Sequence, residues 1–359
     1  MTMDLLSIAA AFDTEGEVLS CQASGNGHIN RTFTVAASSG RRYILQSINH
    51  HVFRDVEALM RNIEAVTAHL KARCGGDPRR VLTLVKTREG KTYLEKEDGE
   101  FFRMFIYVEN SVCLEQAETA EDFYRSAAAF GEFQNQLSDF PANTLAETIP
   151  HFHDTPDRYR QFHQALKSDP LNRAGACKAE IDFVLAREKD AGAMVDMLRD
   201  GRLPLRVTHN DTKLNNIMFD AVTREPLCVI DLDTVMPGLA GNDFGDSIRF
   251  GASTATEDER DLSKVHFSLS LFRAYAQGFL GACGKTLTAL EIETLPLASR
   301  LMTLEVGLRF LTDHLNGDTY FSIARENHNL DRCRTQFRLM AEMEEKDADM
   351  RRVIRETVG

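Results

Sequence analysis

The first 110 residues alternate short apolar runs with turn-forming residues. Residues 33–36, 43–46 and 101–108 are rich in aliphatic and aromatic side chains, a composition that favours β-strands. Residues 54–73 place apolar side chains three and four positions apart, which is the spacing of an amphipathic helix. The pattern also predicts a short helix within residues 1–20 and short strands at 81–85 and 92–94. The pattern predicts a small antiparallel sheet with one long helix.

The pattern changes to a helical period after residue 119. The predicted helices cover residues 123–137, 158–166, 181–198, 288–315 and 338–355, and the last is so rich in charge that we expect it to face solvent. Two short apolar runs, 217–219 and 227–230, flank a polar loop and predict a β-hairpin. We therefore expect an α+β protein with two lobes, a sheet lobe at residues 1–110 and a larger, mainly helical lobe at residues 111–359.

Composition narrows the class of protein. The chain has 359 residues, of which 43% are hydrophobic and 27% charged, as in an ordinary globular protein. Its formal net charge of -12 argues against nucleic acid or an anionic membrane surface as a partner. The seven cysteines form no C-x-x-C pair, no apolar run approaches the ~20 residues of a membrane helix, and the N-terminus lacks the pattern of a signal peptide. We expect a cytoplasmic protein with no membrane partner; its oligomeric state stays open, and a monomer is compatible with the pattern.

The most specific motif lies between residues 206 and 246. His209, Asp211 and Asn216 form an H-x-D-x-x-x-x-N pattern, and a later apolar run ends in Asp231. The predicted hairpin lies between Asn216 and Asp231 and is expected to bring them together. A surface loop in which Asp and Asn cap helices and form turns is the alternative. The full pattern at hairpin distance favours a catalytic site.

These side chains suit phosphoryl transfer. The reaction needs a group that orients the attacking hydroxyl and Mg²⁺ that neutralises charge on the nucleotide phosphates. Mg²⁺ prefers hard oxygen ligands. Asp211 is the expected catalytic base, and Asn216 and Asp231 are the expected Mg²⁺ ligands. Asp233 is either a further ligand or a partner of the site. Lys213 is placed to meet the transferred phosphoryl group, and an ordinary surface lysine is the competing interpretation.

Three neighbouring residues are expected to support this loop. We interpret His209 as a structural brace for the loop. Asp243-Phe244-Gly245 has the letters of the metal-binding triplet of kinases, but the hairpin already places Asp231 in that role. We therefore interpret Asp243 and Asp246 as structural anchors below the loop, with metal ligands as the alternative.

The segment resembles the catalytic core of the aminoglycoside phosphotransferase and choline kinase superfamily. More narrowly, HNDTKLNNI, VIDLDTVMPG and DFGDSIRFGAST are similar to the N-acetylhexosamine 1-kinases, as are GHIN, YILQ with MRNIE after it, HFHDTP and LRFLTDHLNGDTYF. The resemblance runs over nearly the whole chain. It implies a bilobal, protein-kinase-like fold. It also implies transfer of a phosphoryl group from ATP, with Mg²⁺, to the anomeric C1 hydroxyl of N-acetylglucosamine or N-acetylgalactosamine.

The sheet lobe is expected to bind the nucleotide. Gly25 and Gly27 allow a tight turn between strands, which is the layout of a phosphate-covering loop in kinases. We include Asn30, at the end of this loop, among the expected nucleotide contacts.

Two further positions belong to the expected nucleotide site. In a typical kinase the strand at residues 43–46 ends in a lysine that contacts phosphates. Gln46 stands at that place; it can donate hydrogen bonds but has no charge, so it cannot form the usual ion pair with the following helix. Residues 107–110 are expected to form the hinge, where Tyr107 and Glu109 meet the adenine.

The acceptor contacts come from the resemblance. It implies that His28, Arg309 and Tyr320 face the sugar. Taken alone, Arg309 and Asp313 on one predicted helix would be an exposed i, i+4 ion pair, and Tyr320 would be a packed aromatic. The chain contains no Trp, so the aromatic face on which a sugar stacks must come from Tyr or Phe.

Two other functions remain open. A kinase of the same superfamily could act on another hydroxyl, such as that of homoserine, choline, methylthioribose or an aminoglycoside. A cationic acceptor calls for an acidic pocket, which a central Arg309 argues against. A non-catalytic nucleotide-binding module is the more distant alternative, and Gln46 is its only support.

Overall fold

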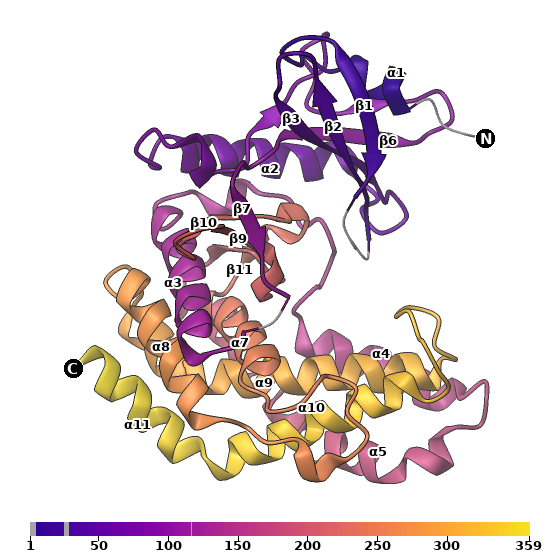
Figure 1. Cartoon of the computed structure of the whole chain (residues 1–359). Coiled ribbons are helices and arrows are strands. Elements are labelled where there is room, and N and C mark those ends of the chain that lie inside the picture. Colours follow the sequence, from indigo (N-terminus) through magenta and orange to yellow (C-terminus); the bar gives the residue numbers. More distant parts are fainter. Residues whose placement is uncertain (1–4, 25–28, 116) are drawn as a thin grey trace. The chain divides into compact units, whose positions relative to one another are not determined.

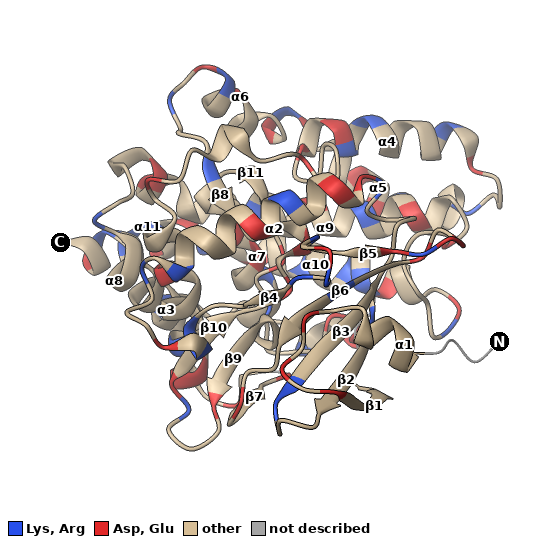
Figure 2. Cartoon of the chain, turned by 90° about the horizontal axis from the view of Figure 1, so that it is seen from above, with Lys and Arg blue, Asp and Glu red and all other residues tan. Residues whose placement is uncertain are grey.

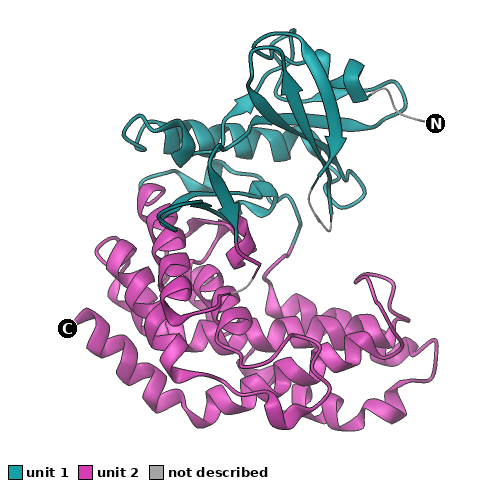
Figure 3. Ribbon diagram, in the orientation of Figure 1, with its two compact units in different colours: residues 1–113, 139–150, 217–236 teal, residues 114–138, 151–216, 237–359 magenta. Residues whose placement is uncertain are grey.

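The computed structural model describes residues 5–24, 29–115 and 117–359. The chain forms two compact units and passes between them several times (Figure 3). The sheet unit comprises residues 1–113, 139–150 and 217–236, and the helical unit comprises residues 114–138, 151–216 and 237–359. The catalytic motif is therefore divided, because Asp211 and Asn216 belong to the helical unit whereas Asp231 and Asp233 belong to the sheet unit.

The main sheet of the sheet unit is antiparallel, with strand order β1-β2-β3-β6-β4 and β5 also paired with β6 (Figure 1). Its strands are β1 (Val18–Ala23), β2 (Arg31–Ala37), β3 (Arg42–Ile48), β4 (Leu84–Val85), β5 (Leu94–Glu95) and β6 (Phe101–Ile106). Alternate residues such as Val35, Leu45 and Met104 are buried in a core with the short helix α1 (Leu5–Ala10) and with Phe12. This alternation is the period-2 pattern of a sheet that buries one face.

Helix α2 (Val56–Lys71) begins where the side chain of Asp55 accepts a hydrogen bond from the N–H of Ala58. The predicted apolar stripe of this helix is buried. Asn62, also buried, donates to the backbone oxygens of Ala146 (2.8 Å) and Val235 (3.0 Å). Helix α2 is thereby fastened to the chain just after the β-hairpin.

The predicted hairpin is confirmed. Strands β9 (Ile217–Asp220) and β10 (Pro226–Val229) pair antiparallel, with Val229 opposite Ile217, and β7 (Ser111–Cys113) pairs with the other edge of β9. The chain then turns sharply at Asp231, whose φ of 57° is in the left-handed region that Asp and Asn tolerate better than most residues. A 3₁₀ turn, Leu232–Thr234, follows directly.

Helices dominate the helical unit. They are α3 (Ala120–Gln136), α4 (Thr155–Ser168), α5 (Lys178–Leu185), α6 (Ala193–Arg199), α7 (Ala240–Gly251), α8 (Leu269–Cys283), α9 (Ala289–Leu315), α10 (His328–Glu345) and α11 (Asp347–Val358). Strand β8 (Arg206–Thr208) leads into residues 209–216, which we call the catalytic loop after their expected role. Strand β11 (Met236–Gly238) spans the point at which the chain passes between units. The α+β class predicted from the sequence is confirmed.

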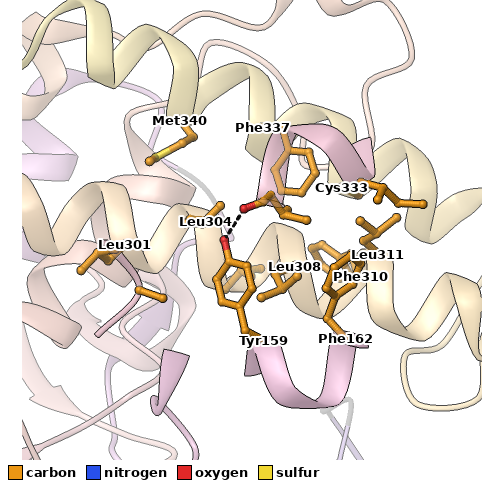
Figure 4. Close-up of a cluster of buried hydrophobic side chains, with 14 of the residues drawn as sticks. Tyr159, Phe162, Leu301, Leu304, Leu308, Phe310, Leu311, Cys333, Phe337 and Met340 are labelled. Carbon is orange, nitrogen blue, oxygen red and sulfur yellow. Dashed lines mark hydrogen bonds between the residues drawn. The ribbon is translucent and has the colours of Figure 1, made fainter. Parts of the chain in front are cut away.

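Helix α9 runs through an apolar core of the helical unit (Figure 4). Leu304, Leu308 and Leu311 of α9 are fully buried, and aromatic and sulfur-containing side chains of α4 and α10 close around them. The hydroxyl of Tyr159 on α4 donates to the backbone oxygen of Val184 at 2.8 Å, so its polar end is paired inside the core. This packing makes α9 a rigid support for the polar side chains that it carries.

Two helix predictions were wrong in detail. Residues 181–198 form two helices, because the chain leaves α5 after Leu185 and resumes as α6 at Ala193. Residues 338–355 belong to α10 and α11, which meet at Lys346. They do not simply face solvent: Met340, Met343, Val353 and other apolar side chains between the charges are buried. The high charge content of the segment led to the wrong prediction, because the buried apolar side chains are spaced between the charged ones.

Two surface properties bear on the expected partners. None of the described helices is long and apolar enough to cross a membrane. Acidic and basic residues alternate along α2 instead of being gathered by sign (Figure 2). Helix α2 therefore does not offer the continuous basic stripe that binds nucleic acid.

Candidate active site

The catalytic loop of the helical unit folds back on itself. Asn216 donates from its side-chain nitrogen to the backbone oxygen of Asp211 (2.7 Å) and to its carboxylate (3.0 Å). The ammonium of Lys213 lies 2.8 Å from the other carboxylate oxygen of Asp211. A 3₁₀ turn, Leu214–Asn216, makes this closure possible. The structure therefore brings Asp211, Lys213 and Asn216 together.

The loop is anchored from below by Asp243 on α7. This buried carboxylate accepts backbone N–H groups from His209 (2.9 Å) and Asn210 (2.8 Å) and the side-chain amide of Gln134 (2.7 Å). Asn210 has a φ of 64°, so the anchor holds a left-handed residue just before Asp211. Each buried donor left without such an acceptor costs about 1–3 kcal/mol. The interpretation of Asp243 as a structural anchor is confirmed.

Asp246 provides the second anchor. Its carboxylate accepts the N–H of Thr212 at 2.9 Å and pairs with Arg249 at 2.8 Å. Arg249 in turn contacts Glu257 at 2.9 Å, so the loop is connected to a wider buried charge network. Sequence reasoning placed no helix here, although α7 carries both anchors.

His209 supports the loop, as interpreted from the sequence. Its ring is fully buried and meets the rings of Phe130 and Phe133 edge-on, at centroid distances of 5.5 and 5.9 Å. Its Nδ1 accepts the backbone N–H of Asp211 at 3.3 Å. These contacts orient the loop at Asp211.

Two opposing effects set the charge state of Asp211. Burial disfavours its ionised form, but the adjacent Lys213 ammonium outweighs burial, so the pKa of Asp211 lies below its ordinary value. Burial likewise disfavours the Lys213 cation, and Asp211 more than compensates, so the pKa of Lys213 is raised. The pair is therefore ionised at neutral pH.

Arg309 on α9 lies among aromatic rings. Its guanidinium carbon is 5.3 Å from the ring centroid of Phe152, 5.4 Å from that of Phe321 and 5.9 Å from that of Tyr320. Within the described part of the chain, its guanidinium makes no hydrogen bond or ion pair to another residue. The structure thus brings Arg309 and Tyr320 together and leaves hydrogen-bond donors of Arg309 unused.

Asp313 does not pair with Arg309, so the simple i, i+4 ion pair is wrong. The buried carboxylate of Asp313 accepts the backbone N–H groups of Thr319, Tyr320 and Phe321 at 2.8–2.9 Å. A buried acceptor with several N–H partners fixes a loop more strongly than an exposed ion pair does. Asp313 therefore holds Tyr320 beside α9.

A buried acid lies one helical turn before Arg309. Glu305 accepts a hydrogen bond from the hydroxyl of Thr155 at 2.7 Å and lies 2.8 Å from Nδ1 of His153. Burial disfavours the charged carboxylate, but His153 and nearby arginines outweigh burial and lower the pKa of Glu305. His153 of the HFHDTP segment is thus paired with an acid inside the helical unit.

The predicted nucleotide residues of the sheet unit are placed as follows. Gln46 accepts a hydrogen bond from Arg103 at 2.9 Å, and the side-chain amide of Asn30 donates to Asp233. The Arg42 guanidinium lies 4.0 Å from the ring centroid of Tyr107 and pairs with Glu109. Gly25, Gly27 and His28 lie outside the described residues.

Sequence reasoning missed Arg103. It is 1% exposed, and it forms an ion pair with Asp233, which is 130 residues away in the sequence. The available signal was an arginine inside the otherwise apolar run at residues 101–108. Such a residue on a buried strand requires a partner.

Comparison with known proteins places this chain in a family. Residues 20–302 match the model of the phosphotransferase enzyme family. An aminoglycoside phosphotransferase from Alicyclobacillus acidocaldarius is similar with a TM-score of 0.60 and 13% identity, over 98% of this chain and 95% of that one. An amicoumacin kinase solved with AMP-PNP and Ca²⁺ is similar with a TM-score of 0.59 and 13% identity, over 96% and 93%.

A microcompartment-associated aminopropanol kinase is also similar, with a TM-score of 0.56 and 15% identity, over 96% of this chain and 97% of that one. At these identities the likeness shows the fold, and the predicted protein-kinase-like fold is confirmed. Because the family model spans well over half of the sequence, this chain belongs to the phosphotransferase enzyme family.

Proposed function

We propose that this phosphotransferase transfers a phosphoryl group from ATP to the anomeric C1 hydroxyl of N-acetylglucosamine or N-acetylgalactosamine. The observation that carries the choice of acceptor is the environment of Arg309. Its guanidinium lies among three aromatic rings, and hydrogen-bond donors remain available in a planar fork that suits adjacent sugar oxygens. A cation at this point disfavours a cationic acceptor such as choline.

The likeness of the chain to N-acetylhexosamine 1-kinases supports the same acceptor. Arg309 and Tyr320 are the residues that this resemblance carries to the sugar, and the helical unit holds them side by side. Asp313 accepts the backbone N–H of Tyr320, which holds this residue beside α9. His28 stays a proposed sugar contact on the strength of the resemblance alone.

The residues of the catalytic loop can perform the transfer. Asp211 accepts a hydrogen bond from the C1 hydroxyl and takes its proton as the new oxygen–phosphorus bond forms and the bond to the ADP leaving group breaks. A carboxylate with a lowered pKa suits a transition state in which little nucleophile assistance is needed and proton transfer comes late. Lys213 offsets charge on the transferred group.

The donor set fits a hard divalent cation. Asn216 donates its amide nitrogen to Asp211, so its side-chain oxygen is the proposed ligand, and the carboxylate of Asp231 is the second proposed ligand. Oxygen donors with few carboxylates are what Mg²⁺ prefers. Bound to Asn216 and Asp231, Mg²⁺ supplies neutralisation of the phosphate charge. The amicoumacin kinase complexed with AMP-PNP and Ca²⁺ supports the use of a nucleotide with a divalent cation.

The remaining nucleotide contacts are proposed from the sequence. We assign Gly25, Gly27 and Asn30 to the phosphate-covering loop and Tyr107 and Glu109 to the adenine.

An acceptor panel tests the proposal. ADP release is measured with Mg²⁺-ATP and N-acetylglucosamine, N-acetylgalactosamine, choline, aminopropanol, homoserine or kanamycin, and NMR locates phosphate on any product. Phosphate on the anomeric carbon of an N-acetylhexosamine is the expected result. Turnover of only another acceptor would replace the sugar assignment and keep the phosphotransferase. Nucleotide binding without turnover of any acceptor would favour the non-catalytic alternative.

Arg309→Met is expected to raise the KM for the sugar at least about 10-fold, because a lost charge-assisted hydrogen bond contributes about 1.5–3 kcal/mol. The KM for ATP should stay within twofold of its original value, since Arg309 serves only the acceptor. Steady-state kinetics with each substrate varied in turn measures both. Arg351→Met removes an exposed arginine of α11 that pairs with Asp347 and is the matched control. An unchanged sugar KM in Arg309→Met would contradict the assignment.

The pH profile reports the ion pair at the catalytic loop. In the wild-type enzyme, Lys213 keeps Asp211 ionised below the ordinary aspartate pKa of about 3.9, so the acid limb of kcat/KM should carry no contribution from Asp211 near neutrality. In Lys213→Met, burial becomes the largest influence on the pKa of Asp211. Because burial disfavours the charged carboxylate, this pKa should rise. The acid limb should therefore move to higher pH, and kcat should fall.

The control is Lys178→Met, which removes an exposed lysine paired with Asp182 on α5. Its pH profile should match that of the wild type. A Lys213→Met profile that also matches would show that Lys213 does not control the base.

A further inference from the structure

The sheet unit contains a buried cation beside the position where kinases of this fold carry a lysine. Gln46 of β3 stands at that lysine position, and the register of the sheet places Arg103 of β6 directly opposite it. Arg103 is 1% exposed, and it is the largest fully buried side chain among the described residues. The cation is thus one strand away from its usual place.

Arg103 makes two directed contacts. Its Nε donates to the side-chain oxygen of Gln46 at 2.9 Å, and its Nη1 donates to one carboxylate oxygen of Asp233. Gln46 is itself oriented, because its amide nitrogen donates to the hydroxyl of Thr32 at 3.2 Å. A lysine at position 46 would place a second cation against Arg103, whereas glutamine supplies the neutral acceptor that the buried guanidinium requires.

Each carboxylate oxygen of Asp233 has a side-chain partner. Its second oxygen accepts the side-chain amide of Asn30, and the side-chain oxygen of Asn30 accepts the backbone N–H of Asn49 at 2.9 Å. Asp233 is 3% exposed. Between the two alternatives left by the sequence, this geometry favours a partner of the site over a metal ligand.

The segment that carries Asp233 also carries Asp231. Asp231 begins the turn in a left-handed conformation, and Asp233 lies within the following 3₁₀ turn. The backbone oxygen of Asp233 accepts the hydroxyl of Thr148 at 3.0 Å, and that of Val235 accepts the amide of Asn62 at 3.0 Å. A short turn that is held at several points transmits a displacement of Asp233 directly to Asp231.

We propose that Arg103 is a positioning residue for the metal-binding turn. It holds Asp231 in its ligating orientation through Asp233, and Gln46 replaces the usual lysine because a buried cation, Arg103, already occupies the facing position on β6. This inference rests on the proposed role of Asp231 as a Mg²⁺ ligand. Neighbours that orient metal ligands typically change metal affinity or activity about 10–100-fold when they are removed.

The test measures metal binding directly. Mn²⁺ is titrated into the full-length protein with saturating AMP-PNP and followed by EPR, with no acceptor present. Arg103→Met is expected to weaken Mn²⁺ binding about 10–100-fold. Arg103→Lys, which restores the charge, should recover part of the affinity. Mn²⁺ affinity equal to the wild type in a folded Arg103→Met protein would overturn the proposal.

Matched variants separate positioning from general destabilisation. Arg31→Met removes an arginine of β2 in the same sheet whose partner, Glu100, is partly exposed, and it should bind Mn²⁺ as the wild type does. Because Arg103→Met leaves a buried carboxylate without its cation, it can fail to fold. Arg103→Met combined with Asp233→Asn removes both charges and decides that case: weakened Mn²⁺ binding supports the proposal, and wild-type binding overturns it.

Asp231→Asn, titrated in parallel, distinguishes the two levels of inference. Weaker Mn²⁺ binding in Asp231→Asn but not in the Arg103 variants would reject the role of Arg103 and keep the proposed metal ligand. Unchanged binding in Asp231→Asn would reject the metal ligand and the positioning role together. The acceptor is absent throughout, so an error in the identity of the sugar affects neither outcome.

Discussion

Replacing Asp211 by Asn is expected to lower kcat about 10²–10⁴-fold while leaving nucleotide affinity within a few-fold of the wild type. Asparagine keeps the size and hydrogen-bonding shape of the side chain but cannot take the proton of the attacking hydroxyl. The loss corresponds to about 3–5 kcal/mol in the activation barrier. Steady-state turnover and calorimetric binding of AMP-PNP measure the two quantities separately.

The loop should survive this substitution. Asn216 still donates to the backbone oxygen of residue 211, and Asp243 still accepts the N–H groups of His209 and Asn210. Asn215→Ala is the matched control, because Asn215 lies on the same loop and, among the residues that the structure describes, its amide makes a single long contact, 3.4 Å from Glu115. A kcat for Asp211→Asn close to that of the control would remove Asp211 from the role of base.

Replacing Asp231 by Asn is expected to raise the half-saturating Mg²⁺ concentration by more than the ~10–100-fold that loss of a supporting residue causes, and to lower kcat at ordinary Mg²⁺. Asparagine is preferred to alanine because residue 231 has a φ of 57°, which asparagine tolerates and alanine does not. The substitution therefore removes the ligand charge without adding backbone strain. Turnover measured across a Mg²⁺ titration provides the value.

The same hairpin offers a control at its other end. Asp220 accepts the N–H groups of Val222 and Thr223 at 3.0 Å each and pairs with Arg79 at 2.9 Å, and these contacts lower its pKa to about 2. Asp220→Asn should weaken the turn and leave the Mg²⁺ dependence unchanged. If Asp231→Asn and Asp220→Asn show the same Mg²⁺ dependence, Asp231 is not a metal ligand.

The sequence by itself determined the features that depend on residues close together in the chain. The H-x-D-x-x-x-x-N motif spans only eight positions, so the contacts among Asp211, Lys213 and Asn216 arise within one loop. The hairpin at residues 217–229, the helix at 56–71 and the α+β class followed from periodicity, because burial of one face imposes a period on the chain. The family could be recognised for the same reason, since its motifs are local.

Local pattern was insufficient wherever a neighbour from another part of the chain sets the outcome. The residues at 181–198 have helical periodicity, yet the structure interrupts them. The charged C-terminal helices bury apolar faces because the partners of those faces lie elsewhere in the helical unit. Hydrophobic periodicity predicts that one face of a helix is buried. It does not predict which other part of the chain packs against that face.

The site shows the same limit most clearly in its buried charges. Arg103 and Asp233 are 130 residues apart, and His153 and Glu305 are 152 apart, so no spacing rule connects them. Helical spacing predicted a pair between Asp313 and Arg309, but the buried carboxylate of Asp313 instead accepts backbone N–H groups of residues 319–321. A buried charge takes the partner that the tertiary structure brings to it, because an unpaired charge in the interior is too costly to keep.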